Sequence, residues 1–511
     1  MRDYQQINAI IREVEGSFPV NSLMYGDVPL WPLIRQDLAR ILFWEDAGRP
    51  DAAALSSALR SIPALPARMA HAVADRVAAS MMHDRLAGTS DVLFLTAGFE
   101  YVSLAGAFYN KFLDPVKELL DARGVSHADV EFGFDGTEYA PKHARTIDLR
   151  RIVGLLSEVA RIGTPGFTRR QRRAVADFAA RCAADFRLAI DVRQVLERAA
   201  RIATLARTFG RVVAAKRPKV CMFVCYYQDA IMAMAHACRR LGVTTVEIQH
   251  SVLSEYEWSW CKWGAIEGAG YSTMPDVFWS WGERYSMMLD CWRRHPGTNL
   301  YPRVGGNLWI WKWRRTEDNA VPESTARLRA AGRTILYTVP FGDSKLMNEW
   351  FPAELEEAIR SAPADWRWHV RLHYKADDAL VESVRRHAEA LGPNVRVHHA
   401  REHHLYHLFS VVDVHLAQTG TTVVEAESFG VPNIILGEVG RAWYRSEIDA
   451  GEYAYARTGA ELLELVRAPS PKLRGTALSQ PRLITDSSCA EALLDELNLL
   501  GESDQCRGRR S

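Results

Sequence analysis

Hydrophobic residues recur at helical spacing over the first 90 residues. Ile7, Ile10, Ile11 and Val14 fall on one helical face, and the same period returns over 30–42. A third stretch, 64–87, interleaves apolar residues with arginines. A basic amphipathic helix of this kind either packs on its own protein or lies on an anionic membrane surface, and both alternatives stay open. We predict that residues 1–90 form a helical N-terminal extension.

From residue 91 the pattern changes to short apolar runs that alternate with amphipathic segments. The runs cover residues 91–98, 127–134, 218–227, 244–250, 275–282 and 301–307. Buried parallel strands read as continuous apolar runs, and alternation with helices favours a parallel sheet. We predict a first α/β domain over 91–315, with a helical insertion at about 140–215.

The same rhythm returns after a polar stretch near residues 312–325. Apolar runs at 333–342, 366–375, 394–400, 413–421 and 431–437 are each followed by a helical pattern. This predicts a second α/β domain over 316–470. Residues 471–511 are expected to form a helix near 487–500 that packs back on one domain, followed by a disordered tail. The predicted fold class is α/β, with two Rossmann-like doubly wound domains that face a cleft.

Composition narrows the class of protein. The 511 residues are 48% hydrophobic and 24% charged, as in globular proteins. Lys and Arg total 63 against 62 for Asp and Glu, which argues against a bulk nucleic-acid partner. No signal peptide or membrane-spanning run is readable, so a cytoplasmic protein is expected, with or without a peripheral contact at the inner face of the membrane. The eight cysteines lack zinc spacing, so we expect reduced thiols and no metal site.

One polar loop stands where a strand of the second domain ends. In open parallel sheets, ligands bind beyond the carboxyl ends of the strands. The candidate donor-binding residues here are Gln418, Thr419, Gly420, Thr421, Thr422 and Glu425. Hydroxyls and the N–H groups of a helix start suit a phosphate, and a carboxylate suits the two hydroxyls of a ribose. An ordinary threonine cap with a first-turn glutamate explains the same residues equally well.

Basic residues alternate along the strand predicted at 366–375. His369, Arg371, His373 and Lys375 share one face because the side-chain period of a strand is two. Four basic groups on a buried strand suggest that its end lines a site for an anion, and the last three join the candidate donor-binding set. An edge strand with a solvated basic face is the alternative. The glycine patterns of dinucleotide-binding and P-loop proteins are absent from the sequence.

The first domain carries a second group at the end of the strand 244–250. Glu247, Gln249 and His250 are candidate catalytic residues, since a histidine with a pKa near neutrality suits proton abstraction from a hydroxyl. A structural histidine is the alternative. The next segment contains Glu255, Tyr256 and Trp258, which suit a sugar acceptor or, equally, a core loop.

Several segments together resemble the bacterial surface-polysaccharide glycosyltransferases of the GT-B type, including capsule, O-antigen and teichoic-acid enzymes. They are VEIQHSVLSEYEW, PDVFWSWGE, VGGN, RLHYK and LAQTGTTVVEAESFGVP, within about 215–455. The resemblance implies a nucleotide-sugar donor, a glycan or glycolipid acceptor, and no bound metal or cofactor. It implies His250 as base or acceptor contact, His373, Lys375 and Thr419–Thr422 on the phosphate, and Glu425 on the ribose.

The sequence departs from that pattern at Ser251, where Gly usually follows Gln-His, and at Tyr374, where Pro usually follows His. Three alternatives stay open. A non-hydrolysing sugar-nucleotide 2-epimerase shares the fold, and polyol-phosphate transfer from a CDP-alcohol is a second possibility. A non-catalytic scaffold that binds glycan through a Trp-rich surface is the third, because the chain has 15 tryptophans.

Overall fold

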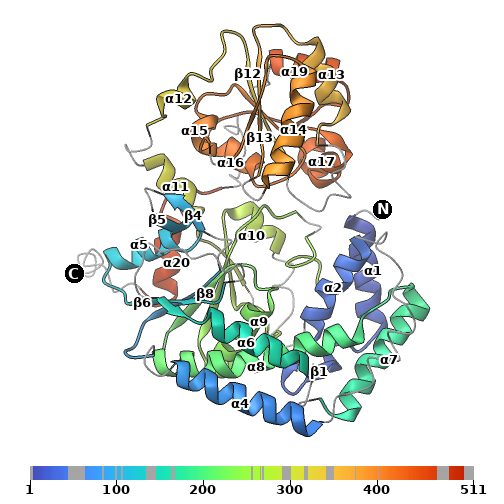
Figure 1. The fold of residues 1–511 in the computed structure, drawn as a ribbon, viewed down its shortest axis with the longest axis vertical. Coiled ribbons are helices and arrows are strands. Elements are labelled where there is room, and N and C mark those ends of the chain that lie inside the picture. Colours follow the sequence, from blue (N-terminus) through green and yellow to red (C-terminus); the bar gives the residue numbers. More distant parts are fainter. Residues whose placement is uncertain are drawn as a thin grey trace, which may run out of the picture. The chain divides into compact units, whose positions relative to one another are not determined.

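The computed structural model describes residues 4–43, 64–82, 86–97, 101–104, 107–133, 146–162, 167–254, 257–264, 266, 270–289, 301–315, 320–340, 350–373, 376–400, 402–468 and 483–499. The chain divides into two compact units (Figure 1). Unit 1 comprises residues 1–308 and 486–511, and unit 2 comprises residues 309–485. Each unit is built around one parallel sheet.

Unit 1 contains a seven-stranded sheet in which all neighbouring strands are parallel. Its strands are β3 (Val92–Thr96), β6 (His127–Glu131), β7 (Thr146–Asp148), β8 (Val220–Phe223), β9 (Thr244–Ile248), β10 (Val277–Ser280) and β11 (Tyr301–Val304). They lie in the order β11-β10-β9-β8-β3-β6-β7. The chain starts in the middle, winds to one edge and then to the other, which is the doubly wound arrangement.

Helices surround this sheet and include the predicted N-terminal ones. They are α1 (Tyr4–Ser17), α2 (Trp31–Phe43), α4 (Ala64–Met82), α5 (Asp114–Ala122), α6 (Arg150–Ile162), α7 (Arg169–Phe186), α8 (Val192–Lys216), α9 (Asp229–Arg240), α10 (Glu283–Leu289) and α20 (Ser488–Glu496). Helix α2 contacts α8, and α4 contacts α6 and α8. The C-terminal helix α20 contacts β11, as expected of a helix that packs back. The predicted tail, 501–511, lies outside the described residues.

Two short hairpins and a 3-10 turn complete unit 1. The turn is η1 (Val20–Ser22), and the hairpins are β1 (Met24–Tyr25) with β2 (Val28–Pro29) and β4 (Tyr101–Leu104) with β5 (Ala107–Asn110). Both hairpins are antiparallel. The sequence analysis missed the second hairpin, which follows the carboxyl end of β3 and brings Tyr101 to that edge of the sheet.

Within the helical insertion expected at about 140–215, the chain from Arg169 to Lys216 forms two helices, α7 and α8. Helix α7 begins with a capping box, in which Thr168 and Gln171 satisfy each other's backbone N–H groups. It ends where Arg187 takes a left-handed conformation with φ of 56°. Helix α8 then begins behind the cap Asp191, whose side chain accepts from the backbone N–H of Gln194. The C-cap of α7 at Arg187 and the N-cap of α8 at Asp191 therefore separate the two helices.

Unit 2 contains a six-stranded parallel sheet. Its strands are β12 (Thr334–Thr338), β13 (Arg367–Arg371), β14 (Val395–His398), β15 (Val414–Ala417), β16 (Asn433–Ile435) and β17 (Ala454–Tyr455). They lie in the order β14-β13-β12-β15-β16-β17, which again is doubly wound. The two predicted Rossmann-like doubly wound domains are therefore confirmed, and the cleft between them stays a prediction.

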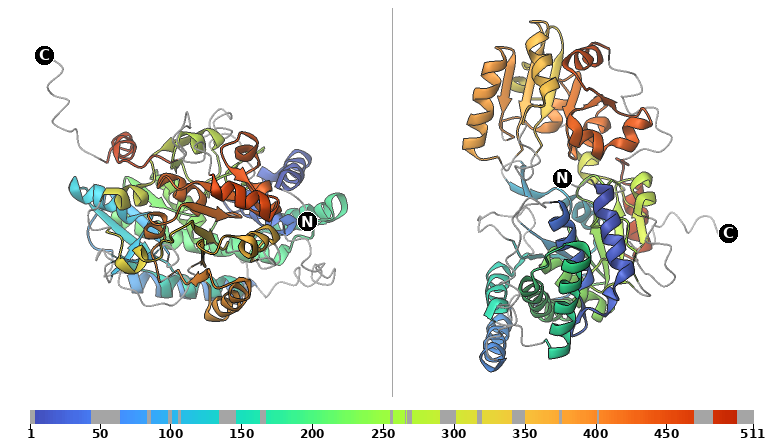
Figure 2. Two further views of the ribbon diagram at one scale, coloured as in Figure 1. Left: turned by 90° about the horizontal axis from the view of Figure 1, so that it is seen from above. Right: turned by 90° about the vertical axis from the view of Figure 1, so that its right-hand side faces the viewer.

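Helices cover both faces of the sheet in unit 2 (Figure 2). They are α12 (Glu323–Ala326), α13 (Ala353–Ser361), α14 (Asp378–Leu391), α15 (Leu405–Phe409), α16 (Thr422–Ser428), α17 (Gly437–Trp443), α18 (Arg445–Asp449) and α19 (Gly459–Arg467), preceded by α11 (Leu308–Arg315) at the division. A cluster of buried side chains, Ile335, Leu355, Val414 and Leu462 among them, fills the space between the sheet and its helices. This packing fixes the positions of the strand ends.

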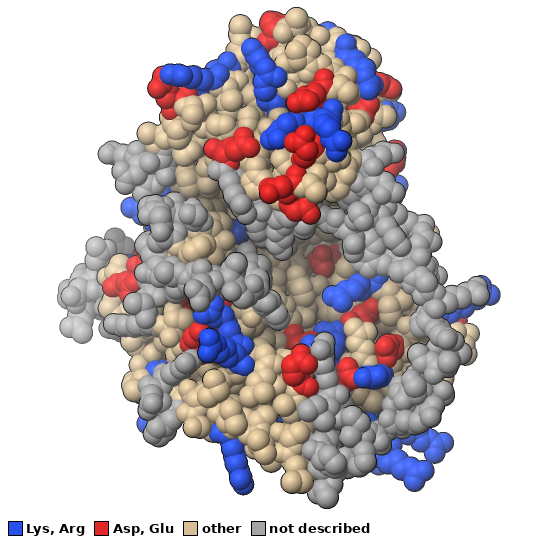
Figure 3. All heavy atoms as spheres, viewed as in Figure 1, with Lys and Arg blue, Asp and Glu red and all other residues tan. Residues whose placement is uncertain are grey.

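The charge distribution on the surface and the state of the cysteines bear on the expectations drawn from composition. Basic and acidic side chains are interspersed over the face drawn in Figure 3. The six cysteines in the described part of the chain are all free thiols. Among the helices that the structure describes, none has the length and apolar character needed to cross a lipid bilayer.

Candidate functional site

The strand order marks one edge of each sheet as the place for a ligand. In a doubly wound sheet, ligands bind at the carboxyl ends of the strands where the order reverses, since the two flanking loops diverge there. The reversal lies between β12 and β15 in unit 2 and between β3 and β8 in unit 1. The polar residues at these two points are therefore the candidates for a binding site.

The loop that follows β15 occupies the reversal point of unit 2. Gly420 has φ of 113°, a backbone conformation that is strained for residues with a side chain. Its carbonyl accepts a hydrogen bond from the Tyr444 hydroxyl at 2.9 Å. Gln418 is buried, and its amide donates to the Tyr337 hydroxyl at 2.9 Å. Gln418 therefore holds the loop from inside. Residues Thr419–Thr422 are half-buried and reach the surface, where a ligand can contact them.

A chain of buried hydrogen bonds fixes the direction of the Thr422 hydroxyl. The Asn433 amide donates to the Val423 carbonyl, so its oxygen accepts from His415 Nδ1 at 2.6 Å. His415 Nε2 then accepts from the Thr338 hydroxyl at 2.9 Å. Because the Thr338 hydroxyl proton is already donated to His415, the Thr338 oxygen can only accept from the Thr422 hydroxyl, at 3.0 Å. The Thr422 hydroxyl is therefore a donor inward and an acceptor outward, contrary to the expectation that it donates to a phosphate.

Arg371 stands at the carboxyl end of β13, beside Glu425. Among the described residues its guanidinium makes one hydrogen bond, a long one from Nη2 to the Ala400 carbonyl at 3.4 Å. Its Nε is buried and has no hydrogen-bond partner among the described residues. Burial lowers the pKa of Arg371 to about 10, against the attraction of Glu425, so the group stays charged at neutral pH. Glu425 is half-buried and accepts from the Tyr406 hydroxyl at 3.0 Å.

The basic residues predicted along one face of this strand differ in burial: His369 is buried inside the unit, whereas Arg371 and His373 are half-buried. β13 pairs with β12 and with β14, so the alternative of a solvated edge strand is wrong. His369 is buried, with Nδ1 2.9 Å from His398 Nε2 and Nε2 3.1 Å from the Leu328 carbonyl. Burial lowers its pKa to about 4, so it is a neutral internal group. His373 follows the strand and is half-buried, and Lys375 lies outside the described residues.

His250 lies at the carboxyl edge of unit 1, just after β9. Its Nε2 is 3.1 Å from Cys225 Sγ and 3.2 Å from the Tyr227 hydroxyl. Both neighbours can donate or accept a hydrogen bond, so these contacts fit either tautomer of the ring. Nδ1 is buried and lacks a hydrogen-bond partner among the described residues. Burial lowers the pKa of His250 to about 3, with a further contribution from Lys111, so the expected value near neutrality is wrong.

Its two companions in the predicted catalytic set are internal supports. Glu247 accepts from the backbone N–H of Tyr226 at 3.1 Å and from Trp260 Nε1 at 3.0 Å. Burial raises its pKa to about 8 despite these donors. Gln249 is also buried, and its oxygen accepts from the Trp281 N–H at 2.8 Å. Both side chains are therefore buried and bonded to the loops near His250, and their catalytic role stays a prediction.

The structure places one of the three predicted acceptor contacts. Trp258 is half-buried, and its carbonyl accepts from the buried Arg35. Glu255 and Tyr256 lie outside the described residues. The Trp258 backbone is thus fixed by α2, although the role of its ring stays a prediction.

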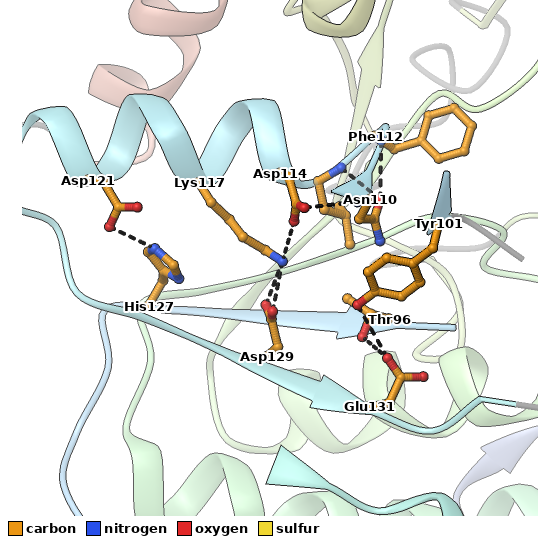
Figure 4. Close-up of polar contacts among 11 residues, drawn as sticks. Thr96, Tyr101, Asn110, Phe112, Asp114, Lys117, Asp121, His127, Asp129 and Glu131 are labelled. Atoms are coloured by element: carbon orange, nitrogen blue, oxygen red, sulfur yellow. Dashed lines mark hydrogen bonds and ion pairs between the residues drawn. The ribbon is translucent and has the colours of Figure 1, made fainter. Parts of the chain in front are cut away.

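A buried carboxylate that the sequence analysis missed lies at the same edge. Glu131 ends β6 and accepts from the Thr96 hydroxyl at 2.8 Å, from the Tyr101 hydroxyl at 3.4 Å and from the Gly133 N–H at 3.0 Å (Figure 4). Thr96 and Glu131 are direct partners in the β3–β6 register. The rule that strand ends carry function would have pointed to both residues.

A buried ion triad anchors α5 behind this edge. Figure 4 shows Lys117 between Asp114 and Asp129. Its Nζ lies 2.8 Å from a carboxylate oxygen of each. Although burial disfavours its charge, the two carboxylates raise the pKa of Lys117, and burial raises the pKa of Asp129. Asp114 also accepts from the Asn110 N–H at 2.8 Å, which ties α5 to the hairpin. The triad therefore supports the hairpin that carries Tyr101 and the Phe112 backbone, which bonds to Asn110.

Comparison with known proteins gives distant structural neighbours. One is S. aureus MnaA in a structure with UDP, with 13% identity and a TM-score of 0.48 over 81% of this chain and 99% of that one. The UDP-GlcNAc 2-epimerase of Neisseria meningitidis, bound to UDP-GlcNAc, has 12% identity and a TM-score of 0.47 over 80% and 98%. OtsA, in its apo form, has 13% identity and a TM-score of 0.44 over 80% and 98%.

No protein-family model matches the chain, and no curated protein matches it either. The assignment of the doubly wound fold rests on the two strand orders.

Proposed function

We propose that the protein is an enzyme that acts on a nucleotide-activated sugar and transfers the sugar to a hydroxyl of a surface glycan or glycolipid. The observation that carries the proposal is Arg371, a cation at a strand end beside the reversal point of unit 2, which makes one long hydrogen bond to the described residues. A buried charge without full compensation is costly, and such groups mark sites that bind the opposite charge. Arginine suits a phosphate because its planar fork matches the phosphate oxygens.

Glu425 supplies the second recognition group. A carboxylate beside a phosphate-binding arginine suits a ribose, whose hydroxyls donate hydrogen bonds. The inward donation by Thr422 leaves the hydroxyls of Thr419 and Thr421 and the loop N–H groups for the phosphates. From the sequence we retain His373 and Lys375 as further phosphate contacts. This arrangement fits a nucleoside diphosphate with its sugar beyond Gly420.

His250 is proposed as an acceptor contact in unit 1 and not as the base. An imidazole whose pKa is near 3 is neutral at pH 7, and it is a weak base for a hydroxyl. Its buried Nδ1 instead has no hydrogen-bond partner among the described residues. We propose that it donates to an oxygen of the acceptor, with Glu255, Tyr256 and Trp258 along the acceptor path.

The test is a pair of titrations by isothermal calorimetry, one with UDP, GDP and CDP and one with the matching nucleosides. Glu425→Gln should weaken binding of both ligand types by about 10-fold or more, because a charged hydrogen bond contributes roughly 1.5–3 kcal/mol. The matched control is Glu427→Gln, since Glu427 lies on the same helix and accepts from Tyr453 at 3.0 Å. If Glu425→Gln binds like the parent, or if no nucleotide binds, the proposal is wrong.

An epimerase of the same fold is the second candidate, and the weak basicity of His250 favours it, because it needs no base for an acceptor hydroxyl. The two are separated by incubating the protein with a labelled nucleotide sugar, with and without a glycan acceptor. A transferase consumes the donor with acceptor present, whereas an epimerase converts the sugar without one. Turnover of a CDP-alcohol alone would indicate polyol-phosphate transfer. Binding of glycan without turnover would indicate a scaffold.

We also propose that α4 contacts an anionic membrane surface. Met69, Val73, Val77 and Met81 are spaced four residues apart and are 62%, 60%, 41% and 38% exposed, with Arg76 exposed between them. The opposite face, with Ala74 and Ala78, is buried against unit 1. An apolar stripe with arginine on a packed helix suits insertion among lipid headgroups.

Co-sedimentation with phosphatidylglycerol vesicles tests this contact. Val73→Asp with Val77→Asp should release the protein from the vesicles, because two carboxylates would enter the apolar zone. The control Met287→Asp changes an equally exposed side chain, 52% exposed, on α10. Equal binding of all three proteins to vesicles would rule out α4 as the contact.

A further inference from the structure

A cluster of metal-ligating side chains lies at the end of β14, in unit 2. His398 closes the strand, and Glu402 and His403 lie in the turn that follows it. One ligand atom from each of the three lies within 4.8 Å of the others. We propose that these three residues bind a divalent transition metal, with zinc as the best-matched ion. The proposal departs from the sequence-based expectation of no metal, and it stands independently of the proposed function.

The donor set favours zinc over the hard cations. Two imidazoles and one carboxylate suit borderline ions such as Zn²⁺, whereas Mg²⁺ and Ca²⁺ prefer oxygen ligands. Three protein ligands leave the fourth tetrahedral position for water or another small ligand. The Glu402 side chain is 45% exposed, so an ion has a path to the site from solvent.

The hydrogen bonds around His398 turn its lone pair toward Glu402. The Leu328 carbonyl only accepts, so the proton of the neutral His369 ring is on Nε2. His369 Nδ1 is then the acceptor, and His398 Nε2 donates to it at 2.9 Å. His398 Nδ1 therefore carries a lone pair, and it lies 3.6 Å from a carboxylate oxygen of Glu402. Two acceptors that face each other repel, and a cation or a hydrogen-bond donor between them would relieve this repulsion.

The separation of these two atoms fits a metal better than a direct hydrogen bond. A charge-assisted N–H···O bond is about 2.7–2.9 Å long, shorter than the 3.6 Å observed. Two ligands at about 2.0–2.2 Å from one tetrahedral zinc are roughly 3.4 Å apart, close to the observed gap. The second oxygen of Glu402 accepts from the His399 N–H at 3.0 Å, which aims the first oxygen at His398.

Both histidines have the outer hydrogen bonds that metal ligands require. His398 is oriented by His369, and His403 Nδ1 bonds with the buried Thr325 hydroxyl at 2.9 Å. Such partners fix the ring orientation and raise the affinity for the metal. Thr325 belongs to α12, and the Leu328 carbonyl follows that helix. A bound ion would therefore fasten the turn after β14 to the α12 segment.

The experiment measures metal binding by the untagged, full-length protein after chelator treatment. Equilibrium dialysis with Zn²⁺ should give one tight equivalent, and Co²⁺ should give the visible absorption bands of a four-coordinate site with nitrogen and oxygen ligands. Glu402→Gln and His403→Ala should each weaken binding at least tenfold. Both side chains lie at the surface of the turn, and circular dichroism would verify that the variants fold.

The control is His387→Ala, which removes another histidine paired with a glutamate, at 2.7 Å from Glu356, on the surface of the same unit. This variant should bind zinc like the parent. The proposal is overturned if the parent binds no zinc, or if Glu402→Gln and His403→Ala retain the parent's affinity. Zinc held by cysteine thiols elsewhere would give the second outcome, because neither variant would affect it.

Discussion

Arg371→Met separates a ligand-binding role from a structural one. Within the described part of the chain the guanidinium has one hydrogen bond. Its 3.4 Å length exceeds the usual 2.7–3.2 Å for N–H···O, and such a bond contributes little to folding. Burying the charge has a desolvation cost, which is why its pKa falls to about 10. Replacement by Met removes the bond and that cost together. The free energy of unfolding should therefore change by no more than about 1 kcal/mol.

The effect on a diphosphate ligand should be much larger. Charge-assisted hydrogen bonds from the guanidinium to phosphate contribute roughly 1.5–3 kcal/mol, or about 10- to 150-fold in affinity. Because charge grows on the phosphate as the sugar leaves, the rate of transfer should fall as well. Nucleoside binding should be nearly unchanged, since a nucleoside lacks the phosphates.

Two measurements on one variant decide between the roles. Calorimetric titration with UDP and with uridine gives the affinities, and urea unfolding gives the stability. Arg367→Met is the control, because Arg367 begins the same strand and is exposed. A loss of about 3–5 kcal/mol in stability with unchanged diphosphate affinity would show that Arg371 is the internal partner of Glu425. The donor site would then lie elsewhere.

Further predictions concern unit 1. Lys117→Met should lower the free energy of unfolding in urea by about 3–5 kcal/mol, because two buried carboxylates lose their cation, whereas the exposed pair of Arg123 should contribute at most about 1 kcal/mol. Equal losses for Lys117→Met and Arg123→Met would contradict the burial argument. Burial raises the pKa of Glu247 from 4.5 to about 8, so the folded state holds an extra proton between these values. Stability should therefore fall as pH rises through this window, by up to about 1.4 kcal/mol per pH unit, and Glu247→Gln should flatten this slope; an unchanged slope would assign it to other groups. His250→Ala should lower acceptor turnover while nucleotide affinity stays the same, and the parent's rate should show no inflection near pH 6.5 from this ring, whose pKa is about 3. If the variant instead lost nucleotide affinity, the proposed role of His250 as an acceptor contact would be wrong.

The larger strands could be predicted because each is an apolar run with a helix behind it. β8 and β12 are buried at every residue, as expected of central parallel strands. β7 and β17 were missed, since they have three and two residues and lie at sheet edges. So short a strand shows no period, and its pairing with an existing edge stabilises it. The hydrophobic pattern of the sequence therefore does not predict such short edge strands.

The candidate site was predictable where it follows one strand and unpredictable where two strands meet. The loop after β15 and Arg371 are each readable from one segment. Glu131 and Thr96 are 35 residues apart and meet through the register of β3 and β6. Likewise, alternation predicted the face of His369 but not its bond to His398 on the neighbouring strand. Pairing between strands is a tertiary property, so the sequence pattern alone could not give it.

The polar groups at the carboxyl edge of unit 2 fall into two kinds, and the division determines where recognition lies. His415 and Thr338 bond to each other and to neighbours within the sheet, and Gln418 is closed against Tyr337. Satisfied buried groups of this kind are rigid supports, because any rotation would leave a donor or acceptor unpaired in a low-dielectric interior. Arg371 differs, since its charge is incompletely compensated by its described neighbours. A ligand that brings negative charge to Arg371 compensates this charge and thereby binds more tightly. The anionic part of the ligand, and not the sugar, should therefore dominate the affinity at this edge.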